Sequence, residues 1–407
     1  MSLKHVRRSL LKDGAFLAID KPLGMTSNDV VTQARAIFSA FLGKKTLKLR
    51  KQKKLRRFTV GHTGTLDPNA SGTLVLAVGC TTPYLRYFTN NRNSTKVYQT
   101  TIKLGRSTRT DDASDLRNNS VIREVDLSWL TKEEVVQHLR HFEGDLMQQP
   151  PTVSAKHIHG ERAHKLEREG RLNPELLQFV PVRIDNLELQ EFRPSRLPEC
   201  DLIMTCGGGT YVRSVARDLG MHIIAQNIGT HLEEKDGEWD YPQYIPGGGS
   251  LVSLKRLVNN NFGIEDTLSI ADLKIALPPR RTGDEEYLQI KPEVWSKFRS
   301  ATNALSHLEN VVLSQTPENY DIHDAWCLRK WIKISSSIPR NIPPEPPIPE
   351  VHIANLERNQ TCSVRVTLDD EFFGVGERSE CGDFVRKEVS SRNVMERFQI
   401  RNRQKNK

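Results

Sequence analysis

The stretch VGHTGTLDPNASGTLVLAVG, residues 60–79, contains a single acidic residue, Asp67, which precedes a proline and lies among glycines and other small residues. It is not a phosphate-binding P-loop, because the Lys-Ser/Thr ending is absent and the segment leads into a strand. A Ser-His-Asp hydrolase is disfavoured, since no G-x-S-x-G turn is present. Two interpretations remain from the residues alone: Asp67 is a turn residue, or its carboxylate acts directly as a nucleophile or base.

The elements around this loop are predicted from apolar periodicity. Strands are expected at 15–20, 73–78, 96–105, 181–192 and 201–206. Helices are expected after residue 26, with Ser27 or Asn28 as the cap, at 131–142 with a Thr131–Glu134 capping box, and after the glycine turn within 206–220. Strands and helices alternate without a regular βαβ repeat, so the sequence predicts a mixed α+β domain and not a doubly wound parallel sheet.

Length and charge narrow the class of protein. The 407 residues allow two or three domains, and 59 Lys and Arg against 50 Asp and Glu give a net charge of +9. That surplus favours a polyanionic partner such as nucleic acid. Six cysteines without a CxxC pair favour free thiols in a reducing compartment. No apolar run approaches the roughly 18 residues of a spanning helix, so no membrane association is expected.

Two basic segments and a linker interrupt the periodic pattern. Residues 44–57, KKTLKLRKQKKLRR, contain basic residues and no acid, which is typical either of a solvated loop or of a phosphate-contacting arm or nuclear localisation signal. Residues 386–407 are also strongly basic. SIPRNIPPEPPIPE, residues 337–350, predicts an extended proline-rich linker.

Five segments in order resemble the TruB family of tRNA pseudouridine synthases: DKPLGMTSNDV, VGHTGTLDPNASGTLVLAVG, KVYQTTIKLG, PPTVSAKHIHGERAHKL and CGGGTYVRSVARDLG. The resemblance covers about residues 14–260. It implies a pseudouridine synthase fold, with a central antiparallel or mixed sheet and flanking helices. It also implies an isomerase that breaks the N1–C1′ bond of the T-loop uridine at tRNA position 55, rotates the uracil and rejoins it through C5. No metal and no organic cofactor are implied.

The resemblance assigns three catalytic residues. Asp67 matches the family's essential aspartate, which attacks the nucleotide or removes a sugar proton. Tyr98 matches a tyrosine that stacks on the target base and handles its C5 proton. Arg213 matches an arginine paired with the aspartate, and a guanidinium beside a shielded carboxylate would keep Asp67 ionised.

Further residues are assigned to binding RNA or the target uridine. His62 matches a histidine that occupies the space vacated by the flipped nucleotide. Lys21 supports the wall of the site, and Leu254 lines the uracil pocket, although the lengthened segment before SLVSLKRL makes that match less direct. The rest of the binding set comes from the same glycine-rich block: Gly61, Thr63 and Gly64.

The expected domain organisation is a basic N-terminal extension at 1–13 and a catalytic domain at 14–270 with insertions at 44–57 and 228–249. A connecting segment at 271–336 and the linker at 337–350 follow. The β domain and basic tail at 351–407 contain SVRVTLDDEFFGVGE, which resembles the closing hairpin of a PUA domain and suggests a degenerate PUA-like fold.

The leading hypothesis is a stand-alone, monomeric enzyme of eukaryotic type that acts on the T arm of tRNA without a protein partner. Its expected compartment is the nucleus, the cytoplasm or both, with the mitochondrion as an alternative because residues 1–14 weakly resemble a presequence; messenger RNA and mitochondrial tRNA are further candidate substrates. Two alternatives are a non-catalytic RNA chaperone or ribosome assembly factor, and a dyskerin-like, guide-RNA-dependent enzyme acting on ribosomal RNA.

Overall fold

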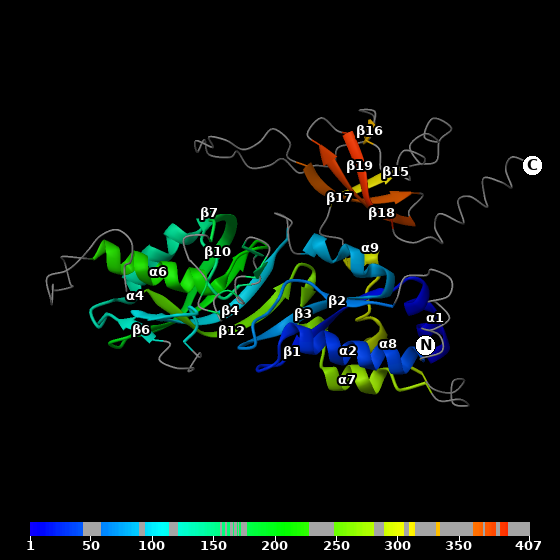
Figure 1. Ribbon diagram of the computed structural model, residues 1–407, viewed down its shortest axis with the longest axis horizontal. Helices are drawn as coiled ribbons and strands as arrows, with labels where there is room; N and C mark the ends of the chain where they lie inside the picture. The colour runs from blue at the N-terminus through cyan, green and yellow to red at the C-terminus, as the bar shows by residue number, and fades with distance from the viewer. Residues whose placement is uncertain are drawn as a thin grey trace, which may run out of the picture.

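The structure is a computed structural model of the chain (Figure 1). It describes residues 1–43, 58–88, 94–113, 121–154, 177–227, 248–280 and 289–304, short pieces at 157–158, 161–162, 166, 169 and 171, and five strands at 309–313, 331–333, 361–368, 371–379 and 383–389. The insertion at 44–57, most of that at 228–249 and the linker at 337–350 lie outside the described residues.

A ten-stranded mixed sheet forms the centre of the molecule (Figure 1). Its order is β14 (Thr267–Leu268), β1 (Ala15–Lys21), β3 (Ala70–Val78), β12 (Gly249–Asn259), β4 (Lys96–Leu104), β11 (Glu199–Cys206), β10 (Val180–Arg193) and β7 (Gly144–Gln148), with β2 (Val60–His62) on β3 and β13 (Phe262–Gly263) on β12. The parallel pairing of β12 with β3 joins two otherwise largely antiparallel halves. The predicted mixed α+β fold with a central mixed sheet is confirmed.

Helices pack on both halves of this sheet. Those of the described chain are α1 (Leu3–Lys12), α2 (Ser27–Leu42), α4 (Lys132–Leu139), α6 (Val212–Gln226), α7 (Ile270–Ala276), α8 (Pro292–Trp295) and α9 (Ala301–Ala304), with 3-10 turns η1 (Gly79–Phe88), η2 (Arg140–Phe142) and η4 (Ile264–Asp266). Four short strands form two hairpins: β5 (Arg106–Thr108), β6 (Val121–Glu124), β8 (His157–Ile158) and β9 (Glu161–Arg162). Helices α2 and α7 lie beside β1 and β3, whereas α4 and α6 lie beside the opposite half (Figure 1). None of the described helices is long and apolar enough to cross a membrane.

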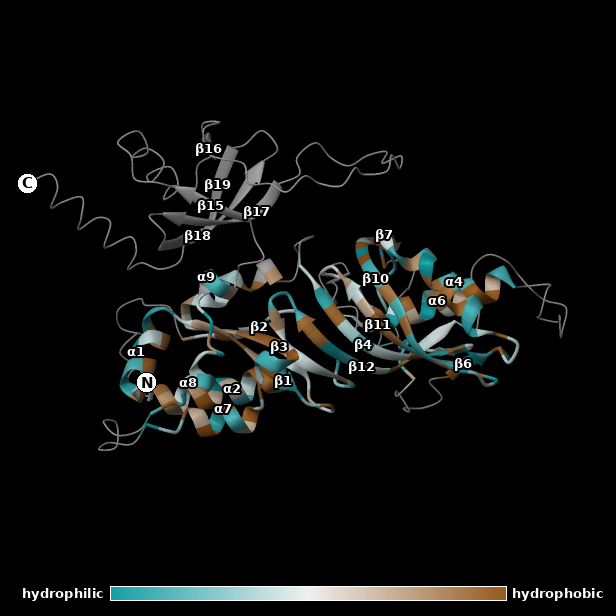
Figure 2. Cartoon of the chain, turned by 180° about the vertical axis from the view of Figure 1, so that it is seen from behind, coloured by the Kyte–Doolittle hydropathy of each residue, from teal (hydrophilic) through white to brown (hydrophobic). Residues whose placement is uncertain are grey.

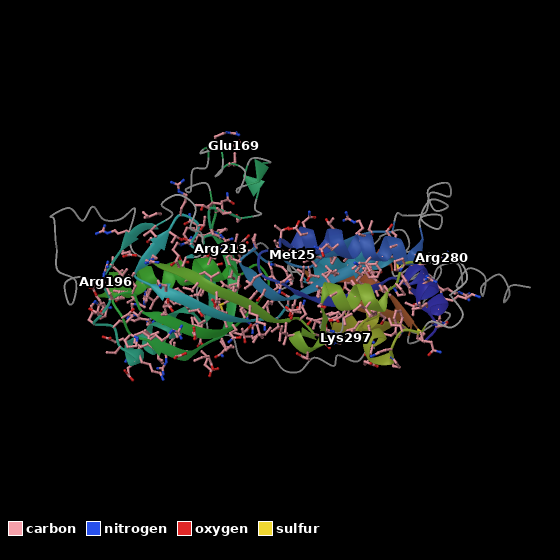
Figure 3. The ribbon with its side chains drawn as sticks, turned by 90° about the horizontal axis from the view of Figure 1, so that it is seen from below. Met25, Glu169, Arg196, Arg213, Arg280 and Lys297 are labelled. Carbon is pink, nitrogen blue, oxygen red and sulfur yellow. The ribbon has the colours of Figure 1, made fainter. Side chains whose placement is uncertain are left out.

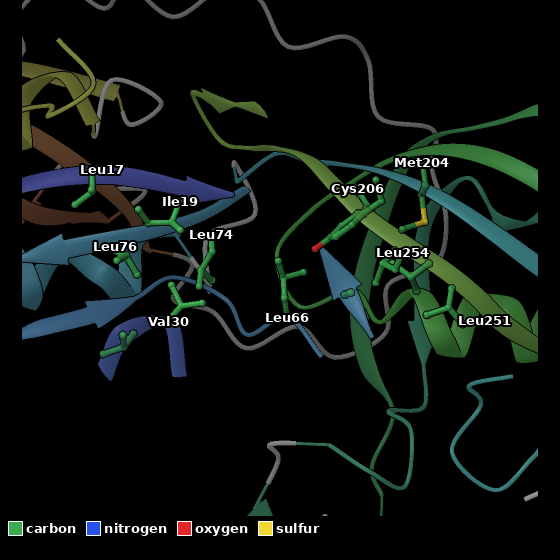
Figure 4. Close-up of a cluster of buried hydrophobic side chains, with 14 of the residues drawn as sticks. Leu17, Ile19, Val30, Leu66, Leu74, Leu76, Met204, Cys206, Leu251 and Leu254 are labelled. Atoms are coloured by element: carbon green, nitrogen blue, oxygen red, sulfur yellow. The ribbon is translucent and has the colours of Figure 1, made fainter. Parts of the chain in front are cut away.

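Strands β1 and β3 are apolar along almost their whole length because both of their faces are covered. One face packs in the main core with Val30 of α2, as Figure 4 shows for Leu17, Ile19, Leu74 and Leu76. The opposite face, from Phe16 and Val75, packs with Tyr84 and Phe88 of η1. Figure 2 shows hydrophobic residues along these central strands. The loop that precedes β3 is therefore attached to a strand that is packed on both faces.

The predicted N-cap of α2, Ser27 or Asn28, is wrong by one or two residues. Thr26 is the N-cap: its hydroxyl accepts from the Asp29 backbone N–H at 3.1 Å, and the Asp29 carboxylate accepts from the Thr26 backbone N–H at 2.9 Å. Ser27 cannot serve as the cap because its hydroxyl is buried and bonded to both backbone groups of Leu66. The predicted capping box from Thr131 to Glu134 on α4 is confirmed.

The N-terminal segment is part of the packed catalytic unit. Leu3, Val6 and Leu10 of α1 are buried in the main core. Arg7 is also buried, donates from Nε to the Phe41 carbonyl at 2.9 Å and lies 4.6 Å from the centre of the Phe41 ring. Residues 3–12 thus pack as a core helix beside α2.

Two boundaries differ from those predicted. The core continues beyond residue 270, because Leu273, Ile290 and Phe298 are buried with the strands of the main sheet. The second sheet also starts earlier than residue 351. Its order is β15 (Glu309–Leu313), β17 (Thr361–Leu368), β18 (Glu371–Ser379), β19 (Asp383–Val389) and β16 (Trp331–Lys333), so two of its strands precede the proline-rich segment.

We predict that Leu10→Ala destabilises the protein by about 2–5 kcal/mol, the usual cost of emptying a fully buried leucine site. Urea denaturation measures the change. The control is Arg8→Ala on the exposed side of the same helix, where the expected change is within about 0.5 kcal/mol. Equal, small effects of both substitutions would show that α1 contributes little to the core.

Candidate active site

The loop between β2 and β3 is held mainly through its backbone. The Ser27 hydroxyl accepts from the Leu66 N–H at 2.9 Å and donates to the Leu66 carbonyl at 3.0 Å. The Pro68 carbonyl accepts from the Gly24 N–H at 2.8 Å and, at 3.5 Å, from the Lys21 ammonium. These hydrogen bonds fix the peptide groups on both sides of Asp67, and the buried Leu66 side chain packs in the main core.

Asp67, in the loop before β3, forms an ion pair with Arg213, in the first turn of α6. The Nε atom of Arg213 lies 2.9 Å from Oδ2 of Asp67; the arginine side chain is 7% exposed and the aspartate side chain 39%. The other guanidinium nitrogens donate to the backbone carbonyls of Thr110 at 3.0 Å and Val153 at 2.9 Å. The guanidinium is therefore fixed on three sides, while part of the carboxylate remains open to a ligand.

Arg213 is positioned by the start of α6, near the middle of the molecule (Figure 3). The N-cap residue Tyr211 has no side-chain cap; its backbone N–H donates to Oε1 of Gln148 at 2.8 Å, and its carbonyl accepts from Nε2 of that side chain at 3.1 Å. The Ser214 hydroxyl adds a bond to the Gln149 carbonyl at 2.9 Å. The positive end of α6 accordingly lies close to Asp67, where it favours negative charge.

Tyr98 and Leu254 lie on neighbouring strands beside this pair. Tyr98 of β4 is 5% exposed, and Leu254 of β12 belongs to the same core cluster. In Figure 4, Leu254 lies in the group with Met204, Cys206 and Leu251, and Leu66 lies between this group and the side chains of β1 and β3. Burial raises the pKa of the Tyr98 hydroxyl, and the charge of the nearby Arg256 opposes that rise, so Tyr98 is a neutral phenol at pH 7.

Lys21 is buried and donates to the carbonyls of Pro22 at 2.9 Å and Met25 at 2.5 Å. Burial lowers its pKa to about 8, although the charge of Asp67 acts in the opposite direction. Lys96 of β4 is buried too, and burial together with the charge of Arg256 lowers its pKa to about 8. Both lysines still carry their protons at pH 7, so the site is strongly electropositive.

His62, at the end of β2, is an uncharged imidazole at neutral pH. Burial, with a smaller effect from the charge of Arg256, lowers the pKa of its ring. Its Nδ1 atom is buried and has no hydrogen-bond partner within the described chain. A neutral, half-buried ring beside an exposed carboxylate is suited to packing against an RNA base.

The three small residues of the block have different surroundings. A Cβ atom on Gly61 would lie 2.6 Å from Leu85. Thr63 is fully buried and its hydroxyl accepts from Nδ2 of Asn259 at 2.7 Å. This hydrogen bond connects the loop to the end of β12. Gly64 has a φ of +54°, a conformation that favours glycine.

Three residues around the site were missed by sequence reasoning: Lys96, Arg256 and Tyr211. The signal for two of them was period-2 alternation, since Lys96 shares a strand face with Tyr98 and Arg256 shares one with Leu254. Tyr211 lies within the CGGGTYVRS segment, two residues before Arg213. For Lys96 and Arg256, the available clue was a charged side chain on the inward face of a strand.

Asp67 is the acid at this site that a ligand can reach. Of the other described acids near the site, Asp29 accepts from the Thr26 backbone N–H at 2.9 Å, Asp111 pairs with Arg217 at 3.1 Å and Asp112 accepts from Asn69 at 3.3 Å. Within the described part of the chain, no group of three or more His, Cys, Asp or Glu side chains could hold a metal ion. A lone, oriented carboxylate in cationic surroundings is suited to act as a nucleophile or base on a polyanionic substrate.

Comparison with known proteins identifies this arrangement. Residues 49–212 match the TruB family pseudouridylate synthase (N terminal domain) model. The tRNA pseudouridine synthase B of Mycobacterium avium (strain 104) is 41% identical over 258 residues, which cover 63% of this chain and 68% of that protein. That of Synechocystis sp. (PCC 6803) is 32% identical over 308 residues, or 76% of this chain and 83% of that protein. The fold and site are those of a pseudouridine synthase, an isomerase. Within that class, the chain belongs to the TruB family.

Solved structures show the same fold at lower identity. A chain of a Cbf5–Nop10–Gar1 complex is 16% identical with a TM-score of 0.52, covering 94% of this chain and 86% of that chain. A chain of an H/ACA RNP bound to a substrate RNA containing 2′-deoxyuridine is 16% identical with a TM-score of 0.51, covering 94% and 87%. At this identity the similarity concerns the fold.

We predict that Gly72→Ala disrupts the pairing of β3 with β12 on which the loop rests. Gly72 has a φ of +99°, and a Cβ atom there would lie 2.2 Å from the Arg256 carbonyl oxygen. Gly24→Ala is the matched control, because Gly24 has a φ of +81° with no atom within 4 Å of its Cβ position. The control should lose about 1–3 kcal/mol in chemical denaturation and Gly72→Ala clearly more. Equal losses would contradict the steric argument.

Proposed function

We propose that this protein converts the T-loop uridine at position 55 of tRNA to pseudouridine, as a stand-alone enzyme with Asp67 as its catalytic carboxylate. The observation that carries the proposal is the Asp67–Arg213 pair, in which a fixed, buried guanidinium presents a partly exposed carboxylate. The curated relatives described above are named as tRNA pseudouridine synthases, which supports tRNA as the substrate.

The proposed reaction conserves every atom of the nucleotide. Asp67 attacks the nucleotide or removes a sugar proton, and the N1–C1′ bond breaks with its electron pair left on the uracil. The uracil rotates while stacked on Tyr98. C5 then forms the new bond to C1′, and Asp67 either leaves the nucleotide as this bond forms or returns the proton to the sugar. C5 then loses its proton and N1 gains one, so no water is consumed. Arg213 orients Oδ2 of Asp67 and balances its charge throughout.

The surroundings of Asp67 support base flipping. The neutral His62 ring is proposed to fill the space that the flipped nucleotide vacates, which offsets part of an unstacking cost of a few kcal/mol. Leu254 supplies an apolar wall next to Tyr98, and Gly61 and Gly64 let the loop pack closely against Leu85, Arg256 and Lys96. Buried Lys21 and Thr63 fix the position of the loop through hydrogen bonds to Pro68 and Asn259.

The finer assignment is a eukaryotic, monomeric enzyme of the nucleus, the cytoplasm or both. The basic run at 44–57, which lies outside the described residues, supports the eukaryotic assignment. In this proposal the sheet of β15 to β19 is a degenerate PUA-like domain that contacts tRNA beyond the T arm.

Asp67→Asn is expected to abolish pseudouridine formation and to leave tRNA binding within about tenfold of wild type, or roughly 1.4 kcal/mol. The substitution removes the reacting group and little contact area. Single-turnover reactions on an unmodified tRNA transcript, mapped by carbodiimide primer extension, measure activity, and filter binding measures affinity.

The control for this variant is Asp20→Asn, which changes an exposed carboxylate on β1. It should retain full activity. Loss of tRNA binding by Asp67→Asn beyond tenfold would mean that the carboxylate maintains structure. Tight binding without modification by the wild-type protein would favour a chaperone or an enzyme that requires a guide RNA.

Neutralising several lysines within 44–57 is expected to weaken tRNA binding and flatten its salt dependence. Each lost phosphate contact removes about 0.7–0.9 units from the slope of log K against log salt concentration. The matched control neutralises Lys4 and Arg8, which are exposed on α1. A slope that equals that of wild type would assign the run to a solvated loop.

A further inference from the structure

Arg256 has the largest fully buried side chain in the described part of the protein. It lies on β12 with its Cα opposite Tyr98 of β4 on one side and Gly72 of β3 on the other. It therefore occupies the seam where the two halves of the central sheet meet, two residues beyond Leu254 on the same strand face. Burying a guanidinium costs free energy unless its N–H donors form hydrogen bonds and its charge interacts favourably with its surroundings.

The donors of Arg256 connect the reactive loop to the sheet. Nε donates to the Thr73 carbonyl at 2.8 Å, within β3, and Nη2 donates to the Gly64 carbonyl at 3.1 Å, within the loop. Its neighbour Asn259 reaches the same loop at Thr63. Arg256 thus bridges the loop that carries His62 and Asp67 to the strand that follows it.

The charge of Arg256 is not neutralised by an acid. Its hydrogen-bond partners in the described chain are the two backbone carbonyls and the Tyr98 hydroxyl, and it forms no ion pair there. A second cation lies beside it: a Cβ atom on Gly64 would be 3.4 Å from Nη1 of Arg256 and 3.6 Å from Nζ of Lys96. Two buried cations without a carboxylate partner fit a site that receives a polyanion.

Arg256 acts electrostatically on site residues from three strands. Its charge lowers the pKa of His62 on β2, Lys21 on β1 and Lys96 on β4, in each case after the larger effect of burial. It also opposes the rise in the pKa of the Tyr98 hydroxyl through its charge and a hydrogen bond. The remaining ionisable neighbour, the Cys206 thiol of β11, is kept neutral by burial, which raises its pKa to about 11.

We propose that Arg256 is the positioning residue of this active site: it locks the His62–Asp67 loop onto the central sheet and fixes the Tyr98 hydroxyl beside it. The inference rests on the proposed function for its consequence in catalysis. A displacement of about 1 Å of the loop would move Asp67 out of line with the nucleotide, and such misplacement costs about 10²-fold in rate.

The test compares Arg256→Gln with Arg256→Lys. Arg256→Gln removes the charge and is expected to lower the single-turnover rate on tRNA about 10²-fold while tRNA binding stays within about threefold of wild type. Arg256→Lys keeps the charge and can no longer bridge both carbonyls, so an intermediate rate is expected. Thermal unfolding identifies the variants that fold.

A second readout separates positioning from general loosening. In ¹⁵N-histidine NMR titrations, assigned with His62→Gln, the pKa of His62 should rise part of the way toward its ordinary value in Arg256→Gln and stay low in Arg256→Lys. Asn259→Ala is the matched control, because it frees the same loop at Thr63 and leaves the charge in place. It should slow the reaction without moving the His62 titration.

Two results would overturn the proposal: a wild-type rate in a folded Arg256→Gln protein, or an unchanged His62 titration in that protein. If Arg256→Gln does not fold, Arg256→Lys decides. A slowed reaction with retained folding and tRNA binding supports positioning, and a wild-type rate excludes it. Failure of the proposed function itself is distinguishable, because the wild-type protein would then form no pseudouridine whereas the His62 titration would still report on Arg256.

Discussion

The contact on which the site depends is the ion pair between Asp67 and Arg213. Each partner depends on the other. Without the guanidinium the loop carboxylate has no fixed orientation, and without the carboxylate the buried arginine carries an unpaired charge. The pair spans two segments 146 residues apart, a glycine-rich loop and the first turn of α6, so the surrounding structure must hold both to within a fraction of an ångström. Backbone carbonyls of Thr110 and Val153 do so for the arginine.

The loop side is held by a different means, and this explains its composition. Side chains from outside the loop, Ser27, Lys21, Arg256 and Asn259, bind its peptide groups or its buried threonine. The loop's own large side chain, Leu66, is buried in the main core and so does not obstruct a flipped nucleotide. The parallel pairing of β3 with β12 supplies the platform, and Gly72 allows it because no Cβ atom fits against the Arg256 backbone.

Most elements of the fold could be predicted from local pattern. The apolar alternation of β4 identified Tyr98, Ile102 and Leu104 as inward residues, and all three are buried. The first cap of α2 was misplaced because Thr26 and Ser27 are both capping types, and the choice depends on Leu66, 39 residues away. Lys96 and Arg256 were missed because alternation places them on the inward face of a strand but does not show that a charged side chain there is buried. That burial follows from strand pairings across more than 150 residues.

The excess of cations around one acid also helps to explain why this site favours isomerisation over hydrolysis. A hydrolase would need a second carboxylate to activate water, as paired acids do in glycosidases. Here the nearby acids Asp29, Asp111 and Asp112 are each engaged with a neighbour, and the buried cations around the loop are Lys21, Lys96, Arg213 and Arg256. In the proposed mechanism the detached uracil is held among these cations, and the described acids near Asp67 are engaged with neighbours and do not activate water. The sugar carbon is then captured by the uracil itself, and the glycosidic bond re-forms through C5.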